Sequence, residues 1–92
     1  MSKSSKMITE YLMLGAIMKK VIEIDYIQEN KRKRVGGIQP IKWLEGREGL
    51  QILTWDTDSN DWRRFEVSKI IRVTITDMEW RNTEVTHSML AG

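Results

Sequence analysis

The sequence of 92 residues has no cysteine, one proline and one histidine, and these scarcities exclude several kinds of chemistry. Without cysteine, the chain has no disulfides and no thiolate metal site. Its histidine, His87, lies in a C-terminal stretch that we expect to fray, where a general base is not held within reach of a target. No serine lies in a nucleophile elbow. We therefore expect a binding protein and not an enzyme, with no cofactor and no metal.

Long apolar runs are also missing. None reaches the roughly 20 residues that a membrane helix needs. The apolar stretch 7–18 is interrupted by Glu10 and followed by Lys19 and Lys20. We therefore expect a cytoplasmic protein without membrane contact. A chain of this length is typical of one domain.

What the sequence does contain is a helical pattern near its start, predicting a helix over residues 7–20. Lys19 and Lys20 suit its C-terminal end, whereas Gly15 weakens it. The preceding residues 1–6 are polar, and we expect them to be flexible. The apolar stripe consists of Met7, Tyr11, Leu14 and Met18, widened by Ile8 and Leu12.

After Lys20 the apolar period changes to two, which indicates strands. Ile22, Ile24 and Tyr26 alternate with acidic residues. A polar turn at 28–33 follows, and further strands are expected over 34–44, 50–56, 62–67 and 70–76. Within residues 34–44, Gly36-Gly37 and Pro40 predict bulges or bends.

Five short strands joined by tight turns predict a mainly β fold, a small SH3-like (Sm-like) barrel over residues 21–76 behind one N-terminal helix. Closure would remove the exposed edges of so small a sheet. Residues 77–92 form a C-terminal extension, in which we expect Trp80 to fold back onto the barrel.

The formal net charge is only +2, but the charges are segregated. Such segregation steers partners of one sign, although basic residues in a hairpin also serve simply as a solvated surface. The acidic run over 56–61 lacks the glycine and the closing glutamate of a calcium loop, so an acidic hairpin turn is the better interpretation. The basic residues gather at Lys31–Arg34 and at Arg63, Arg64, Lys69 and Arg72.

The order of these blocks resembles the WYL domain family. The matching motifs are Ala16-Ile17, Ile22–Tyr26, Ile38–Trp43, Arg63–Phe65 and Lys69-Ile70. The resemblance covers roughly residues 14 to 76, and it implies an SH3-like barrel that senses a nucleotide or single-stranded nucleic acid. The chain departs from the family at the naming triplet, which falls on Leu50-Gln51-Ile52, and at Glu66, where a further arginine is usual.

Our first hypothesis is therefore a non-catalytic regulatory module that binds a nucleotide or single-stranded nucleic acid through a basic barrel rim. Arginine forks bind phosphate, and exposed tryptophans stack on bases. For these residues the alternatives are an ion pair between Arg63 and an acid such as Asp25 or Glu23, and tryptophans that belong to the core or to hairpin pairs. The predicted binding residues are Arg63, Lys69, Arg72, Arg34, Arg32 and Tyr26; the candidate stacking residues are Trp43, Trp55 and Trp62.

The second hypothesis is a protein-interaction or oligomerisation barrel, including a phage-encoded modulator of a host protein. A small barrel does not cover every face of an apolar helix, and methionines make adaptable contacts. The predicted partner-binding residues on the helix are Tyr11, Leu12, Leu14 and Met18.

Overall fold

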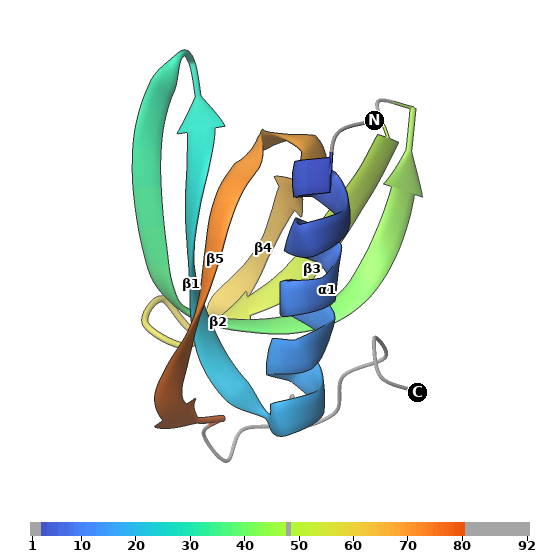
Figure 1. Cartoon of the computed structure of the whole chain (residues 1–92). Coiled ribbons are helices and arrows are strands. Elements are labelled where there is room, and N and C mark those ends of the chain that lie inside the picture. Colours follow the sequence, from blue (N-terminus) through green and yellow to red (C-terminus); the bar gives the residue numbers. More distant parts are fainter. Residues whose placement is uncertain (1–2, 48, 81–92) are drawn as a thin grey trace.

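The structure, a computed structural model, describes residues 3–47 and 49–80 (Figure 1). Within these ranges it is mainly β with one N-terminal α-helix, which confirms the predicted fold class. The elements are α1 (Lys3–Met18), β1 (Lys20–Gln28), β2 (Lys31–Gly46), β3 (Gly49–Asp56), β4 (Asp61–Glu66), the 3-10 helix η1 (Val67–Lys69) and β5 (Ile70–Glu79).

The five strands form one antiparallel sheet in the order β4-β3-β2-β1-β5. The edge strands β4 and β5 are not paired with each other, so the prediction of a closed barrel is wrong. The three residues of η1 carry the chain from one edge strand to the other, and this short turn does not align the two strands for pairing. Instead, α1 lies across the open side of the curved sheet, against β5, β2 and β1 (Figure 1).

Two bulges bend β2 so that it pairs with β1 along its first half and with β3 along its second. Gly37 has a φ of 68°, and its carbonyl accepts a hydrogen bond from the Thr57 backbone N–H at 2.8 Å. The register between β2 and β3 also shifts between Pro40 and Lys42. Proline has no backbone N–H, and at a bulge this absence costs no hydrogen bond of the ladder. Both bulges were predicted from the sequence.

The first hairpin is tighter than predicted. Glu29 and Asn30 have φ values of 52° and 63°, as in a two-residue turn of type I′. Gln28 and Lys31 already form the first pair of the ladder. The basic run that we expected in a polar turn over 28–33 therefore lies in strand β2.

The limits of α1 also differ from the prediction. Residues 3–6, which were expected to be flexible, form its first turn, because adding residues to an established helix costs little. The helix ends at Met18, since Lys19 adopts a φ of 54° and its N–H donates to the Ala16 carbonyl. Gly15 does not interrupt it.

The core lies between α1 and the concave face of the sheet. From α1 it receives Ile8, Leu12 and Ala16. The two residues that widen the predicted apolar stripe are therefore buried, whereas the four that define it are exposed. Trp80 folds back as predicted, because its indole N–H donates to the Lys20 carbonyl at 2.9 Å. The strands contribute Ile22, Ile24, Tyr26, Ile38, Ile52, Phe65, Ile70 and Val73, and η1 contributes Val67.

Candidate functional site

Three of the predicted binding residues surround Asp25 on the outer face of the sheet. Nη2 of Arg32 and Nε of Arg34 each donate to a carboxylate oxygen of Asp25 at 2.9 Å. Arg72 is the cross-strand neighbour of Asp25 on β5, so its side chain leaves the sheet on the same face. Arg32 and Arg34 remain 59% and 66% exposed. The buried carboxylate therefore holds two arginines whose remaining N–H groups face solvent.

The same contacts set the charge state of this cluster. Hydrogen bonds from Arg34 and then from Arg32 lower the pKa of Asp25 from 3.8 to about 2, against the opposing effect of burial. The hydrogen bond to Asp25 in turn raises the pKa of Arg34 above its usual value. Asp25 is therefore ionised at neutral pH, and the three arginines leave a positive charge on this face.

Two of the other three predicted residues, Tyr26 and Lys69, meet in a separate pocket. It has a volume of about 310 Å³ and lies where the end of β1 faces the end of β4 across the unpaired seam of the sheet. The hairpin of β1 and β2 and the hairpin of β2 and β3 rise on either side of η1 (Figure 1). We call this the seam pocket. It is lined by Tyr26, Ile27, Gln28, Gln51, Arg64, Phe65, Glu66 and Lys69.

Aromatic contacts hold the floor of the seam pocket. Tyr26 and Phe65 pack edge to face with their ring centres 5.2 Å apart. The Tyr26 hydroxyl donates to Oε1 of Gln28 at 3.3 Å. Both rings are more than nine-tenths buried, so they shape the pocket and offer little ring surface for stacking. The accessible groups of this pocket are therefore mainly those of its polar side chains.

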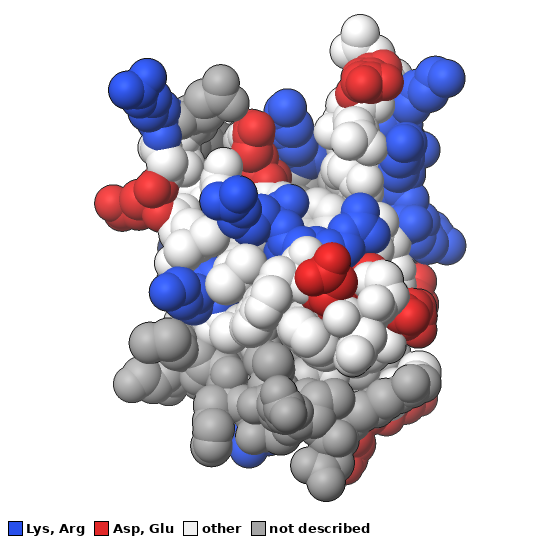
Figure 2. Space-filling view, turned by 180° about the vertical axis from the view of Figure 1, so that it is seen from behind, with Lys and Arg blue, Asp and Glu red and all other residues white. Residues whose placement is uncertain are grey.

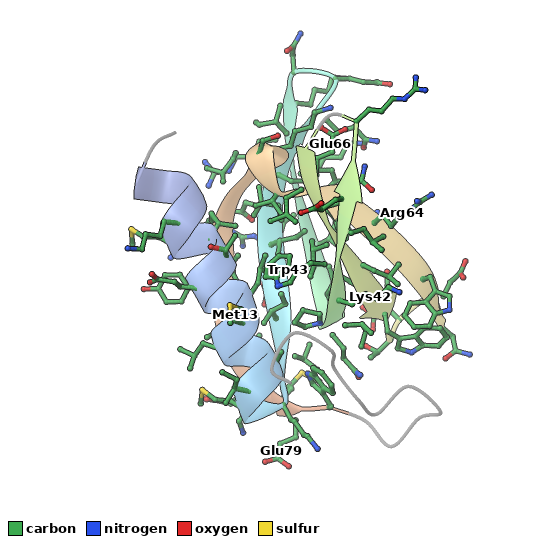
Figure 3. The ribbon with its side chains drawn as sticks, turned by 90° about the vertical axis from the view of Figure 1, so that its right-hand side faces the viewer. Met13, Lys42, Trp43, Arg64, Glu66 and Glu79 are labelled. Carbon is green, nitrogen blue, oxygen red and sulfur yellow. The ribbon has the colours of Figure 1, made fainter. Side chains whose placement is uncertain are left out.

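Charge in the seam pocket comes from two cations and one acid. Nζ of Lys69 lies 3.6 Å from a Glu66 carboxylate oxygen, whereas Arg64 makes no ion pair within residues 3–47 and 49–80. Figure 3 shows Arg64, with Lys42, on the side of the sheet away from α1. Behind α1, lysine and arginine side chains gather across the middle of the surface and along one side (Figure 2). Arg64 thus contributes to the lining of the pocket a cation that has no ion-pair partner among the described residues.

The first hairpin divides its basic residues between two faces. Lys33 is the cross-strand neighbour of Tyr26, and Lys31 is that of Gln28, so both side chains leave the sheet on the side of the seam pocket. Arg32 and Arg34 alternate with them and point to the Asp25 side. Sequence reasoning treated these four residues as one patch, because the pairing register was not known.

Arg63 does not form part of either group. Its Nη1 donates to Oδ2 of Asp56 at 3.4 Å, and its guanidinium lies 5.1 Å from the Phe65 ring centre. Arg63 therefore forms an ion pair with an acid, which is the alternative that we gave, although the partner is Asp56 and not Asp25 or Glu23. Its role as a phosphate ligand stays a prediction. Sequence reasoning placed Arg64 on the outside and did not select it, although alternation with the buried Phe65 was the signal that could have identified it.

Asp56 organises the turn between β3 and β4. Burial alone would raise the pKa of this carboxyl, but hydrogen bonds from the backbone N–H groups of Ser59 and Asp58 and from Arg63 outweigh burial and lower it. Within the described ranges, no group of three or more acidic, histidine or cysteine side chains is arranged to hold a metal ion. The acidic run is a hairpin turn with a structural role.

The tryptophans do not line the seam pocket. Trp55 and Trp62 form a cross-strand pair on the outer face, with ring centres 5.1 Å apart and planes at 79°. Trp43 packs against the core, between α1 and the strands (Figure 3). The alternative of core and hairpin tryptophans is therefore the arrangement observed.

The predicted partner-binding residues on α1 divide in the same way. Tyr11, Leu14 and Met18 are between 41% and 49% exposed. Leu12 is fully buried, so its assignment to a partner surface is wrong. It occupies the opposite side of the helix, which faces the sheet. In the described part of the chain, no helix has the length and apolar character that crossing a membrane requires.

Comparison with models of known protein families and with curated proteins gave no match to this chain. The resemblance to the WYL family therefore rests on the motifs themselves and stays a prediction. One of those motifs bears on the site, because Gln51, the middle residue of the Leu50-Gln51-Ile52 triplet, lines the seam pocket.

Proposed function

We propose that the protein is a non-catalytic module that binds a nucleotide or a nucleotide unit of single-stranded nucleic acid in the seam pocket. The observation that carries this proposal is the meeting of Arg64 and Lys69 with the amides of Gln28 and Gln51 in one pocket. Guanidinium and ammonium groups bind phosphate, and side-chain amides hydrogen-bond the edges of bases. The pocket volume of about 310 Å³ lies at the lower end of the range for small-molecule sites.

The surroundings of the pocket favour a chain of nucleotides over a single one. Lys31 and Lys33 extend the positive surface from the pocket along the first hairpin, and no ion pair with another described residue neutralises either of them. A phosphate backbone that follows this hairpin would release counterions at each contact. Binding is therefore expected to weaken steeply as salt increases.

The test is the affinity of the protein for fluorescein-labelled single-stranded DNA and RNA 12-mers, measured by anisotropy at several salt concentrations. We expect Arg64→Gln and Lys69→Gln each to weaken binding and to reduce the slope of log Kd against log salt by about 1, the effect of losing one phosphate contact. Free mononucleotides, titrated while amide NMR spectra are recorded, show whether the nucleotide unit alone suffices.

Lys19→Gln is the matched control. It removes the same charge at the far end of α1, where Lys19 is exposed, and should change neither the affinity nor the slope. Absence of binding by the wild-type protein to every oligonucleotide and mononucleotide at low salt would refute the proposal. Equal losses in Lys19→Gln and Arg64→Gln would show that net charge, and not the pocket, determines the affinity.

A further inference from the structure

Helix α1 is apolar on two sides, and the sheet covers only one of them. Ile8, Leu12 and Ala16 are buried against the strands. On the other side, Met7, Tyr11, Leu14 and Met18 are 52%, 43%, 41% and 49% exposed. A helix with apolar residues all round is normally covered all round, because uncovered apolar surface costs free energy in water. This exposed stripe therefore calls for a second covering element.

The spacing of the stripe indicates what that element is. Met7, Tyr11, Leu14 and Met18 follow one another at intervals of four, three and four residues, the alternation that places side chains along the seam between two coiled helices. Ile17, which is 59% exposed, lies next to the stripe on the side away from the sheet. Such a seam takes another helix with the same spacing. In the described part of the chain the only α-helix is α1 itself, so a second copy supplies it.

The exposed area agrees with this occupant. A large side chain buries about 150–250 Å² when it is fully covered, so a half-exposed one leaves roughly 100 Å² in solvent. The four side chains of the stripe and Ile17 then offer on the order of 450 Å² per copy, and two copies approach the roughly 1,000 Å² that a specific interface requires.

A groove beside the stripe selects the direction of the second helix. It has a volume of about 440 Å³ and lies between Met7 and Tyr11 of α1 and Ile71 and Ile75 of β5. It therefore flanks the N-terminal half of the stripe. In an antiparallel pair around a two-fold axis, Met7 faces Met18 of the second copy, and Tyr11 faces Leu14. Met18 of the second copy then lies beside this groove.

We propose that the protein forms a two-fold symmetric dimer in which the exposed stripe of α1 packs antiparallel against the same stripe of a second copy. Met18 of each copy then borders the groove of the other, and the contact closes without further growth, as two-fold contacts do. The proposal does not depend on the seam pocket.

Sedimentation velocity over a range of protein concentrations tests the dimer. Leu14→Asn removes a central seam residue from both copies and should raise the dissociation constant of the dimer by about 100-fold, since two leucines lose their burial. Met78→Gln is the matched control, because Met78 is 53% exposed on β5, outside both the stripe and the groove, and should leave the dimer intact. A wild-type protein that stays monomeric at several hundred micromolar, including one that instead binds lipid vesicles or another protein, would overturn the proposal.

Engineered cysteines test the direction, since the chain has none of its own. A mixture of Met7→Cys and Met18→Cys proteins should form a mixed disulfide under mild oxidation, whereas each protein alone should form few disulfides. Efficient crosslinking of Met7→Cys with itself would show a parallel pair and would refute the antiparallel arrangement.

Discussion

Gly15 is the position where the packing of α1 on the sheet can be tested most directly. In an exposed helix interior, replacing glycine by alanine stabilises a protein by about 1 kcal/mol. At Gly15, however, the added methyl carbon would lie 2.7 Å from Cγ2 of Ile22, closer than non-bonded carbons approach. The expected sign therefore depends on whether Ile22 can move.

Ile22 has no room to move away. It is fully buried, and it is paired with Ile38 on β2 and with Ile75 on β5. Forcing an extra methyl group into a packed core costs about 1–3 kcal/mol, which exceeds or cancels the helical gain. We therefore expect Gly15→Ala to lower the free energy of unfolding by about 0–2 kcal/mol.

Urea denaturation followed by circular dichroism measures this change. The same substitution in an Ile22→Leu protein separates the helical gain of alanine from the steric cost against Ile22. Ile22→Leu removes the β-branch that carries Cγ2, so in that background Gly15→Ala should keep its helical gain and stabilise the protein. If Gly15→Ala stabilises the wild-type protein by the full 1 kcal/mol or so expected of an exposed helix, the close packing of α1 on β1 is refuted.

The remaining predictions concern the core, the Asp25 cluster and the first hairpin. Leu12→Ala should cost about 2–5 kcal/mol in urea denaturation, because the side chain is fully buried, whereas Met78→Ala should change stability by less than about 0.5 kcal/mol. The folded-state pKa of Asp25 is lowered from 3.8 to about 2, so its contribution to stability is present above pH 3.8 and is lost as the pH falls through 2. Thermal melts between pH 5 and 2 should therefore show a steeper loss in the wild type than in Asp25→Asn, and equal slopes would contradict this. Lys33→Gln should weaken oligonucleotide binding, while its neighbour Arg34→Gln should mainly lower stability; equal effects on binding would contradict the assignment of the two side chains to opposite faces.

The elements of this fold were predictable because their signals are local. Alternating apolar residues mark each strand, and Gly36-Gly37 and Pro40 mark the two bulges of β2 by their own backbone chemistry. The limits of the first hairpin were not predictable in the same way. Glu29 and Asn30 form a two-residue turn in which neither residue is glycine, so the composition gave no sign of its length.

The candidate site was predictable only in part, because it depends on register. Tyr26 and Lys69 were both predicted as binding residues, and they line the same pocket, but no sequence pattern indicated that these two would meet. The division of Lys31–Arg34 between two faces follows from which residue pairs with Tyr26, a property of two strands together. Likewise, both sides of α1 are apolar, so spacing alone does not tell which side the sheet covers.

The departure from a closed barrel and the presence of the seam pocket have the same cause. The pairing of β5 with β1 begins at Ile70 opposite Tyr26, so the last two residues of β1 extend beyond β5. Across the seam, β4 ends at Glu66 without a further partner strand. A ladder closing this seam would occupy the space with backbone hydrogen bonds and side chains. The seam instead stays open as the pocket that Gln28 and Glu66 line from opposite sides, so the opening that breaks the barrel is also what makes room for a ligand.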